Sequence, residues 1–600
     1  MSRSTRRLAQ GLAGCVLAAA LAGPAAALDR LVFDTGGVNG ALRSGLERAS
    51  LLFGLAAQEA PRPQEVMAAA RADYKRLVGA LYEAGRYGGT VSILVDGREA
   101  AGISPLSPPT RIGTVTVRVD PGPAFALGAA RVVPPPPGAD LPDVFVTGAP
   151  ARLGVLRDAA RAGIDGWRDL GHAKAEVAGE RITANHATST LDAEITLDPG
   201  PRLRFGGLDF AGDTGVRPER LRQIAGFPEG AVFSPDDLDR VTSRLRRTGV
   251  FSAVALDEAE AANPDGTLDI TATLADRLPR RFGAGVEMSS TEGASLSAYW
   301  MHRNLLGGAE RLRFDAEIGG IAGESGGIDY ALGARLTRPA TFTPDTSAYL
   351  DLDLSREDEP DFVSNGIELG AGVEHVFSDR LSGSAGLGLK FADTVRATGP
   401  QDFLLLTAPL SLTWDGRDDA LNAMRGVYLA GEATPFLGLS GSDSGARLTL
   451  DARGYLPLGD RFVLAGRAQL GSVLGATLAG TPPDFLFHSG GGGTVRGHTY
   501  QSLGVDLGNG ATSGGRSFAV LSLEARAHVN GPFGVVAFAD FGLVGPNSLP
   551  DAAAGSHAGA GLGVRYDTGI GPIRLDVATP VSGPSAGSAV QVYLGIGQSF

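Results

Sequence analysis

The sequence predicts an α+β region of small repeated domains, followed by a transmembrane antiparallel β-barrel of about 16 strands. Residues up to about 277 mix helix and strand patterns and repeat them at a spacing near 80 residues. From about residue 278 to residue 600, apolar and polar side chains alternate with the period of a strand. After the first 27 residues, no apolar run reaches the 18 residues of a membrane helix.

Residues 1–27 have the pattern of a secretory signal peptide. A basic start leads into an apolar stretch, and Ala25-Ala26-Ala27 supplies small residues for cleavage before Leu28. A lipoprotein signal is the alternative, because Leu12-Ala13-Gly14-Cys15 is similar to a lipobox. Both interpretations predict export. Cleavage before Leu28 would leave a mature chain without cysteine and hence without thiol chemistry.

The composition argues against a nucleic-acid partner. The chain has 87 glycines and a net charge of −13, and lysine occurs at only three positions. Arginine therefore carries most of the positive charge, and no basic run forms a footprint for nucleic acid.

The first region contains three copies of one pattern. The peptide Asp-Pro-Gly-Pro begins at Asp120 and again at Asp198, each time after an alternating strand pattern. A glycine that follows a helix pattern recurs at Gly85, Gly171 and Gly249, at spacings of 86 and 78 residues. Glycine suits a helix C-terminus because it adopts positive φ without strain. We expect three domains, at residues 28–123, 124–201 and 202–277.

The third copy has the clearest elements. Strand patterns at residues 203–210, 253–256 and 268–274 surround helix patterns at residues 218–224 and from Ser234 onward. Ser234 and Pro235 form a good helix start, because serine caps the first turn and proline fits the first helical position. The predicted order is strand, helix, helix, strand, strand.

The second region, residues 278–600, is predicted to be the barrel. In residues 311–318 and 521–529, apolar side chains alternate with charged ones of both signs. A soluble sandwich would also alternate, but its polar face needs no such density of charge. Apolar residues facing lipid and ion pairs facing a wet lumen explain the pattern better.

The sequence contains no motif for an enzyme. The eight histidines show no HExxH or other close metal spacing, and neither a phosphate-binding GK[ST] loop nor a GxSxG elbow occurs. We therefore expect no catalysis, no metal and no cofactor.

A different kind of site is indicated by Val495, Arg496, Gly497 and His498, which follow a run of four glycines. An arginine inside a lumen is costly unless a carboxylate pairs with it. The candidates are Asp540, on the strand pattern at residues 538–542, and Glu524. The alternative is a surface arginine in a mobile loop.

These residues resemble signatures of the outer-membrane insertase and translocase superfamily that includes BamA and TamA. The stretch Val495–His498 is similar to its VRG[YF] signature, although His498 stands where an aromatic residue is usual. Further similarities occur, in the same order, at residues 302–308, 415–422, 538–542, 571–576 and 590–600. The repeated domains resemble POTRA domains, and three of them before a barrel are typical of the TamA family.

The resemblance implies a location and a function. The barrel would lie in the cell outer membrane, with POTRA domains in the periplasm, and Arg496 would lock its loop to Asp540 on the wall. Unfolded outer-membrane protein clients of autotransporter type would add a strand at a lateral seam, with a TamB-like inner-membrane-anchored partner and outer-membrane lipid as further partners. The seam would lie between Gly283 and Gly285 on one strand and Gly595, Gly597 and Phe600 on the other. The alternatives are a two-partner-secretion-type channel and a passive porin-like barrel.

Overall fold

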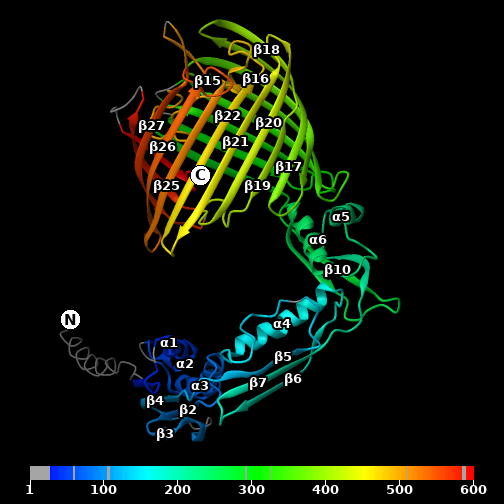
Figure 1. The fold of residues 1–600 in the computed structure, drawn as a ribbon, viewed down its shortest axis with the longest axis vertical. Coiled ribbons are helices and arrows are strands. Elements are labelled where there is room, and N and C mark those ends of the chain that lie inside the picture. Colours follow the sequence, from blue (N-terminus) through cyan, green and yellow to red (C-terminus); the bar gives the residue numbers. More distant parts are fainter. Residues whose placement is uncertain are drawn as a thin grey trace, which may run out of the picture. The chain divides into compact units, whose positions relative to one another are not determined.

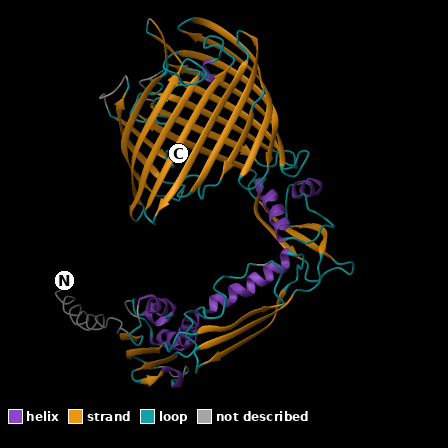
Figure 2. Cartoon of the chain, viewed as in Figure 1, coloured by secondary structure: helices purple, strands orange, loops and turns teal. Residues whose placement is uncertain are grey.

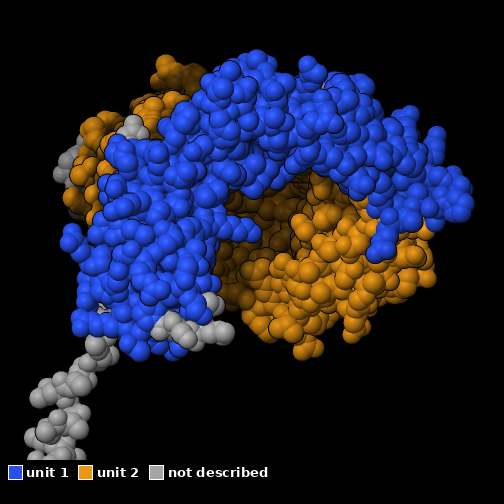
Figure 3. Space-filling model, turned by 90° about the horizontal axis from the view of Figure 1, so that it is seen from below, with its two compact units in different colours: residues 1–206, 229–236, 260–268 blue, residues 207–228, 237–259, 269–600 orange. Residues whose placement is uncertain are grey.

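The computed structural model describes residues 28–38, 40–58, 61–104, 109–138, 140–290, 293–323, 326–508, 510–569, 571–583 and 590–600. The predicted signal peptide, residues 1–27, lies outside these described residues. The chain divides into two compact units, coloured separately in Figure 3. The first unit comprises residues 1–206, 229–236 and 260–268, and the second comprises residues 207–228, 237–259 and 269–600.

Three small sheets come before the barrel, each combined with helices (Figures 1 and 2). Their strand orders are β1-β4-β2-β3, β5-β7-β6 and β8-β10-β9, so the first strand of each domain pairs with the last long strand of that domain. The strands are β1 (Leu28–Asp34), β2 (Thr90–Val95), β3 (Arg98–Glu99), β4 (Ile112–Asp120), β5 (Ala126–Val133), β6 (Glu176–Asn185), β7 (Thr190–Asp198), β8 (Arg204–Ala211), β9 (Phe251–Glu258) and β10 (Thr267–Asp276). The helices are α1 (Gly40–Ala49), α2 (Leu51–Leu55), α3 (Pro63–Glu83), η1 (Ala100–Gly102), α4 (Leu153–Asp169), α5 (Pro218–Ala225) and α6 (Pro235–Arg247).

The repeats seen in the sequence correspond to repeated backbone geometry. Gly85, Gly171 and Gly249 follow α3, α4 and α6 and have φ values of 72°, 100° and 71°. In both Asp-Pro-Gly-Pro turns, the aspartate Oδ1 accepts a hydrogen bond from the glycine N–H two residues later, at 3.1 Å from Gly122 and 2.9 Å from Gly200. The order predicted for the third copy is confirmed by β8, α5, α6, β9 and β10.

The second region is a closed antiparallel barrel of 16 strands, which confirms the predicted fold class. Two labels, β18 and β19, belong to one interrupted strand, because both pair with β17 on one side and with β20 on the other. The 17 labelled segments therefore make 16 strands. Pro409 lies at the interruption, where its missing N–H cannot join the ladder. The strands are β11 (Arg280–Ser289), β12 (Gly293–His302), β13 (Arg311–Ile321), β14 (Asp329–Arg338), β15 (Thr346–Glu359), β16 (Phe362–Val376), β17 (Leu381–Arg396), β18 (Gly399–Thr407), β19 (Leu410–Asp415), β20 (Gly426–Ser440), β21 (Gly445–Leu458), β22 (Phe462–Leu474), β25 (Ser517–Asn530), β26 (Phe533–Gly545), β27 (Gly555–Tyr566), β28 (Ile573–Ser582) and β29 (Gln591–Ile596).

The barrel surface is apolar. On β15, Leu350, Leu352 and Leu354 are 55%, 40% and 40% exposed, and the aspartates between them face inward. Such exposure would be costly in water, whereas a lipid environment stabilises it. None of the described helices is long and apolar enough to cross a membrane.

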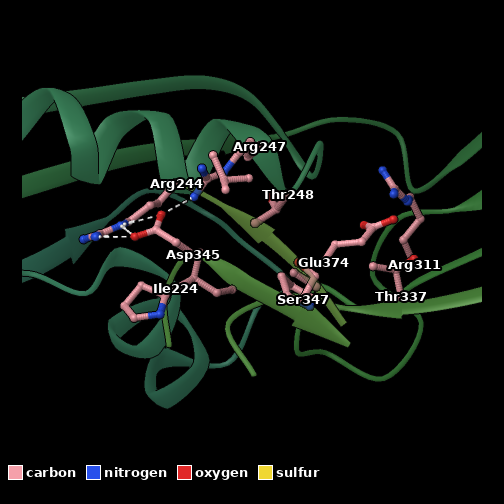
Figure 4. Close-up of a pocket in the computed structure, with 13 residues that line it drawn as sticks. Ile224, Arg244, Arg247, Thr248, Arg311, Thr337, Asp345, Ser347 and Glu374 are labelled. Atoms are coloured by element: carbon pink, nitrogen blue, oxygen red, sulfur yellow. Dashed lines mark hydrogen bonds and ion pairs between the residues drawn. The ribbon is translucent and has the colours of Figure 1, made fainter. Parts of the chain in front are cut away.

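Within the second unit, the helices of the third domain contact the turn between β14 and β15 (Figure 4). Asp345 in this turn accepts hydrogen bonds from Arg244 Nη2 and Arg247 Nη2 of α6, both at 2.6 Å. Arg220 of α5 is 6% exposed and donates to the backbone oxygens of Pro339 and Ala340. The third domain is thus attached to the barrel by three arginines.

Candidate functional site

The barrel contains a long connection, residues 475–516 between β22 and β25, that packs against its wall. It includes η2 (Pro483–Phe485), β23 (Val505–Gly508) and β24 (Ala511–Ser513). Val495 and Leu503 of this connection are buried in one apolar cluster with Phe518 and Val544 of the wall. At these residues the connection, called the lumen loop from here on, is therefore held against the wall as part of the core.

Arg496 of the lumen loop pairs with both predicted carboxylates. Its Nε donates to Asp540 Oδ2 at 2.7 Å, its Nη2 to Asp540 Oδ1 at 2.9 Å, and its Nη1 to Glu524 Oε1 at 2.6 Å. The backbone N–H of Arg496 also donates to Asp540 Oδ2, at 3.1 Å. The guanidinium carbon lies 3.6 Å from the ring centroid of Phe538, within range of a cation–π contact.

The pair belongs to a balanced network of six buried charges. Glu524 also accepts from Arg526 Nε at 2.9 Å, and Asp576 lies 3.6 Å from Arg496 Nη1 while pairing with Arg565. Three guanidinium groups thus meet three carboxylates. The exposed fractions are Arg496 2%, Arg526 7%, Arg565 3%, Glu524 1%, Asp540 2% and Asp576 0%. Since an unpaired buried ion costs several kcal/mol, each member depends on the others.

Glycines on both sides bring the loop backbone against the wall. Gly497 has a φ of 95°, and a Cβ there would lie 2.6 Å from the backbone carbon of Thr579. On the wall, a Cβ at Gly559 would lie 1.9 Å from the backbone oxygen of Arg496. The N–H of Gly497 donates to the Tyr593 hydroxyl at 3.1 Å, so the lumen loop is bound directly to the last strand, β29.

The glycine run before Val495 has a more specific role than general flexibility. Gly490 and Gly491 have φ values of 118° and 94°, where other residues are strained. A Cβ at Gly490 would also lie 2.3 Å from the Thr499 oxygen, whereas a Cβ at Gly493 would meet no atom within 4 Å. Two of the glycines in the run are therefore required by backbone geometry.

His498 stands in place of an aromatic residue and packs against a second ring, which is tilted by 42° and not stacked. It is 0% exposed, and its Nε2 donates to the Ala558 oxygen at 2.9 Å. Its ring centroid lies 4.2 Å from that of His557, which in turn contacts Ser489 of the lumen loop.

The predicted seam is closed by a short ladder. The first strand begins at Arg280 and the last strand ends at Ile596, and among the described residues their register pairs are Met288 with Leu594 and Ser289 with Tyr593. Ser290, just after β11, adds hydrogen bonds to Val592 and Gln591 of β29. By contrast, β11 and β12 share ten register pairs. Across the seam, Arg574 of β28 adds an ion pair with Glu287 at 3.1 Å.

The structure places the predicted seam residues differently from the sequence-based expectation. The last strand was expected to extend to Phe600, but it ends at Ile596, and Gly597 turns the chain with a φ of 92°. Phe600 is not at the seam. It is 8% exposed in an apolar cluster with Ala423, Tyr455, Val463 and Ala465, and its oxygen accepts from Arg526. Burying the ring inside the barrel removes its apolar surface from water.

The seam glycines make room for side chains of neighbouring strands. A Cβ at Gly283 would lie 2.1 Å from Tyr299 Cε1, and one at Gly285 would lie 2.7 Å from Ser297 Oγ. Gly595 similarly lies beside Arg574, where a Cβ would be 3.1 Å from Nε. These contacts give the three glycines a packing role in addition to any weakening of strand pairing.

Sequence reasoning missed three charged members of the network, Arg526, Arg565 and Asp576, and the hydroxyl of Tyr593. Each was visible as a polar residue at an alternating inward position. However, spacing along a strand does not show which inward positions of different strands lie at one depth. Among the described residues, no group of three or more His, Cys, Asp or Glu side chains is arranged to hold a metal ion.

Comparisons with known proteins agree with this architecture. Residues 304–600 match the Omp85 superfamily domain, and residues 203–275 match a POTRA model described as a surface antigen variable number repeat. The chain is 27% identical over 402 residues to outer envelope protein 80, chloroplastic, of Arabidopsis thaliana, a match that covers 60% of this chain and 51% of that protein. The chain therefore spans about half the length of this curated relative.

Two solved structures show the same fold. BamA from Haemophilus ducreyi lacking POTRA domains 1–3 has a TM-score of 0.61 at 18% identity, covering 79% of this chain and 100% of that one. CdiB from Acinetobacter baumannii has a TM-score of 0.50 at 14% identity, covering 79% of this chain and 90% of that one.

The fold is thus a closed barrel of 16 antiparallel strands with a POTRA domain in front of it. Residues 304–600 thus match the Omp85 superfamily domain, and the fold is similar to that of BamA and CdiB.

Proposed function

We propose that this protein inserts unfolded outer-membrane proteins, by opening the seam between β11 and β29 and pairing client strands with the exposed edge. The observation that carries the proposal is the ladder of two register pairs at the seam, against ten on the other side of β11. Separating strands that share so few register pairs costs little free energy. An open strand edge is then a template to which a client strand can pair. The proposal requires no covalent chemistry and no cofactor.

The buried network supports this mechanism by holding one side of the seam. Through Arg496, the lumen loop is bound to β25, β26 and β28, and through Gly497 it is bound to Tyr593 of β29. The last strands therefore form one fixed body. The seam would open by movement of β11, whose residues Arg280–Glu287 have no register partner on β29.

We further propose the finer assignment to the TamA family, with a TamB-like inner-membrane-anchored partner and autotransporter-type clients. Its support is the three small domains before the barrel. Cross-linking in cells through residues 28–201, followed by identification of the attached protein, tests it. A large inner-membrane-anchored protein is expected, and a set of small lipoproteins would contradict the assignment.

A disulfide across the seam tests the mechanism. Met288→Cys with Leu594→Cys would join two opposed residues that both face lipid. The matched control is Leu296→Cys with Ile318→Cys, an opposed lipid-facing pair between β12 and β13. We expect the oxidised seam variant to lose client insertion and to recover it with a reductant, while the control keeps it. If the locked seam works at the normal rate, clients do not use it, and a channel through the lumen becomes the better explanation.

A further inference from the structure

Four arginines gather where the third domain joins the barrel. Arg277 lies between β10 and β11, Arg280 and Arg281 begin β11, and Arg303 follows β12. On the barrel wall, Arg313, Arg335 and Arg453 each pair with a carboxylate. In the part of the chain that the structure describes, none of the four arginines at the junction has such an ion pair.

Arg303 is the arginine of this group that burial and hydrogen bonds hold in place. It is 8% exposed, its Nη1 donates to the Leu278 oxygen at 2.7 Å, and its backbone N–H donates to the Pro279 oxygen at 2.9 Å. Burial, together with the nearby charges of Arg281 and Arg277, lowers the pKa of Arg303. Like charges held together in this way are stabilised by an anion, because an anion offsets their mutual repulsion.

Apolar side chains lie beside the arginines, and Phe282, on the face of β11 opposite to Arg281, faces away from the lumen. Leu278 is 83% exposed and Phe282 is 72% exposed. Phe282 lies opposite Trp300 of β12, whose ring is 5.8 Å from that of Phe314. Outward aromatic residues near the end of a barrel strand are typical of the membrane interface, where headgroups lie.

The edge of β11 is open at this level. Its ladder with β29 covers only Met288 and Ser289, so the stretch from Arg280 to Glu287 has no register partner on that side. Arg281, which faces the lumen and lies over the Tyr299 ring at 5.7 Å, is thus next to an unpaired edge. A molecule in the membrane beside the seam would meet cations at the headgroup level and the Phe282 side chain next to them on β11.

We propose that the periplasmic end of β11, with Arg280 on its outward face and Arg277, Arg281 and Arg303 beside it, binds the phosphate of an anionic phospholipid, whose acyl chains lie along Phe282. Free phosphate would share the charge recognition but would leave this aromatic ring uncovered. The exposed Phe282 therefore favours a lipid as the ligand.

The test measures lipid retained by the purified full-length chain in detergent, by native mass spectrometry, with phosphatidylglycerol or phosphatidylcholine added. The variant is Arg280→Ser with Arg281→Ser. The matched control is Arg461→Ser, which removes an exposed arginine beside Asp460 in the turn between β21 and β22, at the same rim of the barrel. Each arginine near an anionic surface contributes about fivefold in affinity, so the double variant should bind phosphatidylglycerol about 30-fold more weakly.

The control should bind as the original chain does, and phosphatidylcholine should bind more weakly than phosphatidylglycerol. Equal retention by the double variant and the control would overturn the proposal. Displacement of phosphatidylglycerol by inorganic phosphate alone would show that the site recognises phosphate without the lipid and would overturn the lipid assignment. Folding of the double variant is judged by its migration in gel electrophoresis without boiling. If it fails to fold, Arg280→Ser alone is compared with the same control, with an expected loss of about fivefold in affinity for phosphatidylglycerol.

Discussion

Arg496 shows how one residue connects a loop to four strands. Its guanidinium group is shared by Asp540 and Glu524, and its own carbonyl lies where a side chain at Gly559 would have to be. Removing the cation would take from the buried carboxylate of Asp540 its ion-pair partner, at a cost of about 3–5 kcal/mol, whereas Glu524 keeps Arg526. The strand ladder does not pass through Arg496, so the barrel itself does not depend on it.

Arg496→Ala is therefore expected to reach the outer membrane in normal amount but to insert clients poorly, with the lumen loop released to protease. The measurements are the amount of protein in outer membrane, the rate of client insertion and the proteolysis of residues 475–516. Arg453→Ala is the matched control, because its partner Asp451 keeps Arg467 at 2.8 Å. Normal client insertion by Arg496→Ala would refute the role of the lock.

At the scale of elements, α6 is attached to the turn between β14 and β15 through a single carboxylate. Although partial burial would raise the pKa of Asp345, hydrogen bonds from Arg244 and Arg247 lower it to about 2. Because this pKa is lower in the folded state, the contact stabilises the fold above the unfolded pKa, about 3.9 for an aspartate. The stabilisation is lost as the pH falls from about 4 towards 2.

Hydrogen exchange of the α6 amides should therefore be the same at pH 5 and pH 7 once the rates are corrected for intrinsic chemistry. Arg244→Ala should increase exchange in residues 235–247 at both pH values. Arg240→Ala should not, because that arginine pairs with Asp237 within the same helix. Faster corrected exchange in the unmodified chain at pH 5 would show that another group controls the contact.

On the scale of the whole molecule, the first two domains have cores of their own. One cluster is built on Val66, Leu77 and Val117, and another on Leu156 and Ile195. Neither shares a residue with the clusters of the barrel. These separate cores predict that the second unit folds without residues 28–201.

A chain with residues 1–27 followed directly by residues 202–600 is expected to insert into the membrane and to migrate as a folded barrel in electrophoresis without boiling. If the proposed partner binds through residues 28–201, the same chain should no longer cross-link to it. Electrophoresis without boiling and cross-linking are the two measurements. A shortened chain that fails to fold would mean that the first two domains stabilise the barrel.

Prediction from the sequence worked where a rule is local. Gly85, Gly171 and Gly249 were placed correctly because a helix C-terminus needs positive φ at one residue. Arg496 and Asp540 were paired because the resemblance to a known superfamily supplied a contact between segments far apart in the chain. Phe600 was placed wrongly at the seam, since an alternating pattern does not show where a strand leaves the ladder.

The sequence by itself determined the repeated domains, the alternating strands and the positions of the candidate lock, because period, turn chemistry and order are properties of short segments. Only the tertiary structure decided which inward charges share one depth, that Phe600 is buried inside the barrel and that the seam has two register pairs. These features depend on how strands are staggered when the barrel closes. That stagger is set by packing among all the strands together.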